Sequence, residues 1–243
     1  MNFRKEFETH LTNFSDNYPD IKREFEKSEM HNPTMNLTYW YTHIYMLTKL
    51  GVEEWPKDTS ILDLGTQMGV VPHYLKEIGF TDVSASNSKK EAGDTLEDLE
   101  LVWSCMDLNV QHLHIKPEEE FTLDKKYDII LGTHINIHWN MRKMLKIYNS
   151  KILTDNYYVR DKHNNSHTYF VPYNTSELKF FIENIKKYLT PTGKALINFH
   201  PFPYWEDRFK EELDLLKEHC EVGHCDSDDI LFQHSYIIIE GDK

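Results

Sequence analysis

Cysteine is scarce in this chain, and long apolar runs are absent. The 243 residues include only 3 cysteines, which are too few for a disulfide framework and lack the spacing of a metal site. This scarcity favours a reducing, cytoplasmic setting. No segment approaches the roughly 20 consecutive apolar residues of a membrane span. The charged N-terminus also lacks the apolar stretch of a signal peptide. We therefore expect no membrane partner.

Basic residues are in deficit as well. The chain has 27 lysines and arginines against 40 aspartates and glutamates, a formal net charge of −13. A phosphate backbone rewards clustered positive charge, so this balance argues against a nucleic-acid partner. A local basic patch is still compatible with the count, and solubility alone would also explain the acidity. We expect a small-molecule partner and draw no expectation about the oligomeric state.

The chain does contain enough apolar material for one α/β domain. Apolar residues make up 40% and aromatic residues 13% of the sequence, which is ample for a core at this length. The stretch from Ser60 to Gly69 combines a short apolar run, an acidic residue and a glycine-punctuated turn. It predicts a buried strand, a tight turn and the start of a helix. Such a junction is where α/β proteins hold nucleotide-like ligands.

Strand and helix patterns alternate along the rest of the chain. Strands are predicted at 60–64, 82–86, 110–115, 127–131, 194–199, 220–224 and 230–240, and helices at 69–78, 89–108, 136–148, 175–189 and 206–219. A turn is predicted at Pro191–Gly193. This order predicts an α/β fold with a seven-stranded, mostly parallel, doubly wound sheet, a C-terminal antiparallel hairpin and additional N-terminal helices.

Two segments fall outside this alternation. Residues 1–56 predict an N-terminal helical cap segment, ahead of an α/β domain at 57–243. The helix expected at 35–50, which ends before Gly51, carries aromatics on nearly all sides. It either packs in the core or caps the ligand crevice. A polar and then aromatic insertion at about 150–175 has loop character and is also compatible with a hairpin.

Three motifs in order resemble the class I S-adenosylmethionine-dependent methyltransferases. Residues Ile61–Gly69 are similar to the family's first motif, an acidic residue followed by spaced glycines. Residues Lys126–Gly132 are similar to its fourth-strand motif, and Tyr188–Ile197 to its turn into strand five. The resemblance covers roughly 60–240. It implies S-adenosylmethionine as the cofactor and methyl transfer as the reaction.

The resemblance also implies a set of cofactor-binding residues. They are Asp63, Gly65, Gln67, Gly69, Asn87, Glu118 and Thr133. Asp63 would hold the methionine amino group, although it could instead cap the following turn. Two positions depart from the family pattern: Gln67 replaces the middle glycine, and Asn87 replaces the acidic residue that bonds the ribose. Asn87 could equally be a helix N-cap, and Glu118, expected near the adenine, could belong to a solvated acidic loop.

Two histidines follow the predicted fourth strand, where the resemblance implies that the methyl group meets its acceptor. His134 is the first candidate for a general base and His138 the second, since a free imidazole titrates near pH 6.5. Either could instead hydrogen-bond the backbone. Their His-x-x-x-His spacing, repeated at His163 and His167, lacks a third ligand at motif spacing. We therefore expect no bound metal.

Aromatic residues border the expected mouth of the site and form a candidate acceptor pocket. The candidates are Tyr41, Tyr169, Tyr173, His200, Tyr204 and Trp205. The alternative is that these side chains pack the insertion and the N-terminal segment onto the domain.

Motifs that are missing narrow the function further. The Asp/Asn-Pro-Pro-Tyr and Pro-Cys motifs of DNA-base methylation are absent, and so is the Gly-x-Gly-x-x-Gly pattern of nicotinamide enzymes after the first strand. We expect methyl transfer from S-adenosylmethionine to an oxygen or nitrogen of a small molecule. The alternative is a methyltransferase-like binding or scaffold domain without catalysis, which the departures at Gln67 and Asn87 motivate.

Overall fold

A computed structural model covers the chain. It describes residues 44, 47–48, 50–67, 69–88, 96–113, 115, 119–132, 159–160, 167–168, 175–199, 221–225 and 234–242. The helices predicted at 136–148 and 206–219 and the residues before 44 lie outside the described residues. Within the described part, no helix is long and apolar enough to cross a membrane.

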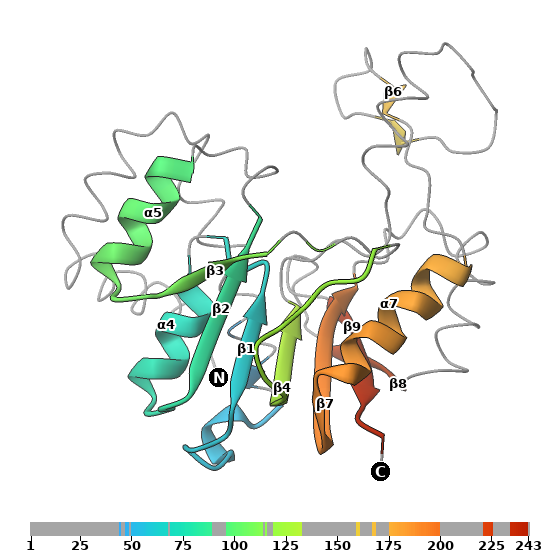
Figure 1. Ribbon diagram of the computed structural model, residues 1–243, viewed down its shortest axis with the longest axis horizontal. Helices are drawn as coiled ribbons and strands as arrows, with labels where there is room; N and C mark the ends of the chain where they lie inside the picture. Colours follow the sequence, from blue (N-terminus) through green and yellow to red (C-terminus); the bar gives the residue numbers. More distant parts are fainter. Residues whose placement is uncertain are drawn as a thin grey trace.

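A mixed sheet forms the centre of the fold (Figure 1). Seven strands lie in the order β3 (Val110–His112), β2 (Val83–Asn87), β1 (Ile61–Leu64), β4 (Tyr127–Gly132), β7 (Leu189–Phe199), β9 (His234–Glu240) and β8 (Glu221–Cys225). The strands from β3 to β7 are parallel, and β9 is antiparallel to both β7 and β8. The predicted mostly parallel sheet with a C-terminal antiparallel pair is thus confirmed. Strand β3 is shorter than predicted, because it ends at His112 and not at Ile115.

Both faces of the sheet are covered. The described helices are η1 (Val52–Glu54), α4 (Val70–Glu77), α5 (Leu96–Cys105) and α7 (Thr175–Lys187). Because side chains alternate along a strand, Ile61 of β1 packs with Val71 of α4. Leu62, the next residue, packs on the other face with Phe181 of α7. The sheet is therefore wound on both sides, as the alternation of elements predicts.

The end of the N-terminal segment packs on the α4 side. Ile44 and Leu47 are helical, and with Val52 they are buried in the same apolar cluster as α4. Gly51 has a φ of +73°, a left-handed conformation that suits glycine, and it starts the 3-10 turn η1. The predicted stop at Gly51 is therefore confirmed at this position.

The turn predicted at Pro191–Gly193 is wrong as a break before the fifth strand. These residues form a bulge within β7, because Tyr127 pairs with Leu189 while Ile129 pairs with Lys194. Two steps along β4 thus correspond to five along β7. A Cβ at Gly193 would lie 2.8 Å from the carbonyl oxygen of Tyr127, so only glycine lets the bulge approach β4 this closely.

A short two-stranded ladder lies within the segment that we interpreted as an insertion. Strand β5 (Val159–Arg160) pairs antiparallel with β6 (His167–Thr168), and the two form their own sheet. The predicted hairpin character is confirmed for these four residues.

Candidate functional site

A glycine-containing bend connects β1 to α4 at the carboxyl ends of the parallel strands (Figure 1). We call Gly65–Gly69 the bend. Its first, middle and last residues all have positive φ angles: +68° at Gly65, +48° at Gln67 and +87° at Gly69. The Thr66 N–H donates to the Ser86 carbonyl at 2.8 Å, which ties the bend to the end of β2. Ligands of open α/β sheets bind outside this edge.

Gln67 keeps the backbone conformation that a glycine would adopt. Its side chain is exposed, so it projects away from the packed interior. The cost of a non-glycine residue in the left-handed region, about 1–2 kcal/mol, still applies. The middle residue of the bend therefore carries backbone strain that a glycine would not.

Asn87 holds the bend from the end of β2. Its Oδ1 accepts a hydrogen bond from the Gln67 N–H at 3.1 Å, and its Nδ2 donates to the Ser88 carbonyl at 3.3 Å. The side chain is buried. Asn87 therefore bonds the backbone of the bend, and the ribose contact implied by the resemblance stays a prediction.

Asp63 lies directly before the bend and is completely buried. In register it is flanked by Ala85 of β2 and Leu131 of β4, two apolar neighbours on the same face of the sheet. Its burial beside the bend fits a role in holding a polar ligand group.

Two buried hydroxyl groups lie at the same edge. Thr66 Oγ1 and Ser86 Oγ have no hydrogen-bond partner among the residues that the structure describes. An unpaired buried hydroxyl costs about 1–3 kcal/mol. A polar ligand bound at this edge would offer such partners.

Trp103 of α5 contacts the bend, and this contact was not predicted from the sequence. Its Nε1–H donates to the Gln67 carbonyl at 2.6 Å. The helical stripe of Leu96, Leu99, Val102 and Trp103 indicates only a core position. A buried indole does need an acceptor for its N–H, and this is the one signal that could have directed attention to Trp103.

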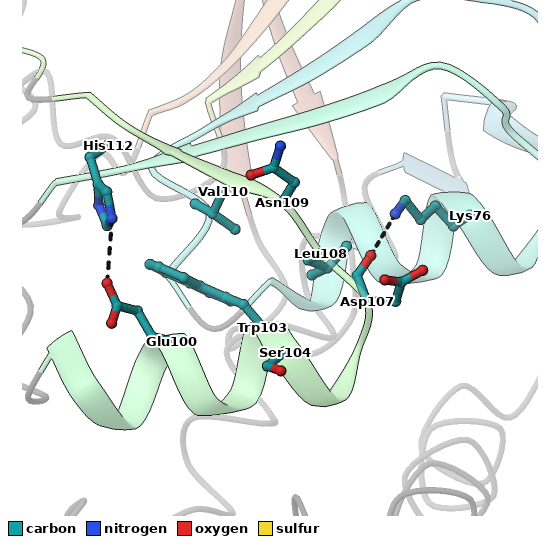
Figure 2. Close-up of a pocket in the computed structure, with 9 residues that line it drawn as sticks. All are labelled: Lys76, Glu100, Trp103, Ser104, Asp107, Leu108, Asn109, Val110 and His112. Carbon is teal, nitrogen blue, oxygen red and sulfur yellow. Dashed lines mark hydrogen bonds and ion pairs between the residues drawn. The ribbon is translucent and has the colours of Figure 1, made fainter.

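A cavity of about 490 Å³ opens beside Trp103, between α5, β3 and the end of α4 (Figure 2). Glu100 and His112 face each other across it, with Glu100 Oε1 3.5 Å from His112 Nε2. Lys76 closes the other end by donating to the Asp107 carbonyl at 2.9 Å. The cavity walls include none of the site residues predicted from the sequence.

His73 lies one helical turn after the bend, and its N–H donates to the Gly69 carbonyl at 3.1 Å. Burial lowers the pKa of its imidazole, and this effect exceeds the opposing influence of the Glu77 carboxylate. A neutral imidazole at pH 7 therefore lies in the first half of α4. Among the described residues, no three histidine, cysteine, aspartate or glutamate side chains are grouped to hold a metal ion.

Five predicted cofactor residues are brought together by the fold. They are Asp63, Gly65, Gln67, Gly69 and Asn87, all at or beside the bend. The other predicted site residues lie outside the described residues: Glu118, Thr133, His134, His138, Tyr41, Tyr169, Tyr173, His200, Tyr204 and Trp205.

Comparisons with known proteins give likenesses of fold. No family model and no curated protein matches the chain. The PH0226 protein from Pyrococcus horikoshii OT3 aligns with a TM-score of 0.50 at 12% identity, over 88% of this chain and 94% of that one. N-methyltransferase NodS from Bradyrhizobium japonicum WM9, in complex with S-adenosyl-L-homocysteine, aligns at 0.47 and 10% identity, over 93% and 98%. A methyltransferase from Pyrococcus furiosus aligns at 0.45 and 16%, over 82% of each chain. At these identities the likeness shows a shared α/β fold and nothing about chemistry.

Proposed function

We propose that this protein is an S-adenosylmethionine-dependent methyltransferase acting on an oxygen or nitrogen of a small molecule. One observation carries the proposal. Three positive φ angles, at Gly65, Gln67 and Gly69, shape a bend at the carboxyl edge of a parallel sheet, directly after a buried aspartate, and ligands of open α/β sheets bind at this edge. The resemblance of Ile61–Gly69 to the family's first motif supports the same assignment.

The residues at this edge fit the cofactor. Asp63 would hold its amino group, and the buried hydroxyls of Thr66 and Ser86 would gain partners that the described residues do not supply. When bound, S-adenosylmethionine supplies a methyl group already activated by its sulfonium. The protein then needs only to place an acceptor in line, exclude water and remove a proton.

His134 is our candidate for removing that proton, with His138 second. The acceptor pocket would draw on Tyr41, Tyr169, Tyr173, His200, Tyr204 and Trp205. The net charge of −13 supports a small-molecule acceptor over a nucleic acid.

A binding or scaffold domain without catalysis is the second candidate. It is favoured by one observation: Asn87 directs its Oδ1 to the Gln67 N–H, where the family places a carboxylate toward the ribose. A neutral amide that already accepts a bond holds a ribose less strongly than a carboxylate does.

Titration calorimetry with S-adenosylmethionine and S-adenosylhomocysteine tests both candidates. The proposal expects heat with each ligand and, at a ligand concentration of 100 times Kd, a stabilisation of about 2.7 kcal/mol in thermal unfolding. An Asp63→Asn variant, checked for native circular dichroism, should lose at least tenfold in affinity. If the native chain gives no heat with either ligand, the proposed methyltransferase function is wrong. Binding without transfer of a labelled methyl group to any small-molecule fraction would favour the second candidate.

A further inference from the structure

The middle residue of the bend is strained and needs support from its surroundings. Gln67 has a φ of +48°, a conformation that costs a residue with a Cβ about 1–2 kcal/mol. Such a conformation persists only when neighbouring contacts over-determine it. The polar groups that meet the Gln67 backbone are therefore the ones that hold this strained residue.

Both backbone polar groups of Gln67 are held by side chains. Asn87 Oδ1 accepts from its N–H at 3.1 Å, and Trp103 Nε1–H donates to its carbonyl at 2.6 Å. The two side chains are only 5% and 4% exposed. Hydrogen bonds in such poorly solvated surroundings are stronger than bonds exposed to water.

Trp103 also contacts the last residue of the bend. A Cβ added at Gly69 would lie 3.2 Å from Trp103 Cδ1 and would collide with Leu108 Cδ1. The indole therefore donates to the middle of the bend and occupies the space that a side chain at its last residue would need. It lies against the face of the bend that packs on α5.

The indole is itself held in place. Figure 2 shows its ring extending from α5 toward β3, and its centroid lies 6.1 Å from that of the His112 ring. His112 is in turn paired with Glu100, one helical turn before Trp103. The indole thus lies beside a β3 side chain that is itself paired with a residue of α5.

We propose that Trp103 is a positioning residue for the cofactor. Its indole N–H binds the Gln67 carbonyl and so holds a glutamine in the positive-φ conformation, at a position where the first motif of the methyltransferases has a glycine. This inference rests on the proposed function. Trp103 acts through the bend, and the residues that touch the ligand are those at its edge.

A double-mutant cycle tests the proposal. Trp103→Phe removes the N–H donor, and Gln67→Gly removes the need for it because glycine adopts positive φ freely. In the native background, Trp103→Phe should weaken S-adenosylhomocysteine binding about threefold to tenfold. In the Gln67→Gly background, the loss should be less than about twofold.

A matched control separates this role from packing. Leu99→Val trims a side chain of the same helix that is 1% exposed and cannot donate a hydrogen bond. It should change affinity by the same factor in both backgrounds. Equal losses for Trp103→Phe in the two backgrounds would overturn the proposal and leave Trp103 as a core residue.

The contact between Trp103 and Gln67 can also be tested if the proposed function is wrong. If the native chain binds neither ligand, the same cycle is read from the unfolding equilibrium constant in urea. A coupling of about threefold or more between Trp103 and Gln67 supports the positioning contact without a cofactor. No coupling there overturns it.

Discussion

Tyr127 begins β4, and its hydroxyl donates to Asp124 Oδ1 at 2.8 Å. Burial raises the pKa of this phenol to about 12, and the Asp124 carboxylate adds to the rise. In the unfolded chain the phenol loses its proton near pH 10, whereas the folded chain retains it until about pH 12. Its contribution to stability is therefore complete below pH 10 and is lost as the pH rises between these values.

This loss can be measured on a single variant. Across that interval the native protein should lose roughly 1–2 kcal/mol through Tyr127, after allowance for solvent screening. Tyr127→Phe should be less stable at neutral pH by about 1 kcal/mol, because it lacks the hydrogen bond. Its stability should then fall less steeply in urea unfolding between pH 10 and pH 12. Parallel curves for the two proteins would contradict this reading.

At the residue scale, the features that depend only on neighbouring residues in the chain could be predicted from the sequence. Gly65 and Gly69 were predicted as bend glycines, and both have positive φ. The contacts of Trp103 and Asn87 with Gln67 could not be read from sequence, since they join residues 36 and 20 positions apart. Such long-range bonds depend on how α5 and β2 pack, and no local pattern encodes that.

At the scale of elements, Asp128 of β4 links the two strands on either side of it, β1 and β7. Its Oδ2 accepts from the Ser60 N–H at 3.0 Å, just before β1. Its Oδ1 accepts from Thr190 Oγ1 at 2.9 Å, inside the bulge of β7. One carboxylate thus fixes the start of β1 and the path of the bulge.

Removing this carboxylate should loosen both elements. We expect Asp128→Ala to lower the free energy of unfolding by about 2 kcal/mol, because two partly buried donors lose their acceptor. Asp128→Asn is the matched control: it retains one acceptor oxygen and should cost about half as much. Chemical denaturation of the three proteins checks the order. A cost for Asp128→Asn equal to that for Asp128→Ala would show that charge, and not acceptor number, matters here.

Strands were predicted more reliably than their irregularities. The apolar runs of β1 and β4 were correct to within one residue at each end, because a central parallel strand needs a continuous apolar run. The bulge at Pro191–Gly193 was mistaken for a turn. Proline and glycine mark both features equally, and only the pairing of β4 with β7 distinguishes them.

At the scale of the whole molecule, two apolar clusters lie on opposite faces of the sheet, and β1 contributes to both. Amide hydrogen exchange should therefore be slowest in β1 and β4, which open only on global unfolding. The edge strands β3 and β8 should exchange sooner, since each has one neighbour. Mass spectrometry of exchanged peptides measures this order. Equal protection of β3 and β1 would contradict the described arrangement.

The chain end near β9 has a practical consequence for biosensors. The Gly241 N–H donates to the Gly193 carbonyl at 2.9 Å, which anchors the residue after β9 beside the bulge. In Figure 1 the carboxyl end of β9 (red) lies at the lower end of the sheet, whereas β1 points its carboxyl end upward. A sensor surface that captures the protein by a tag placed after β9 would thus leave the opposite edge of the sheet, where β1 ends and the bend lies, accessible to dissolved ligands.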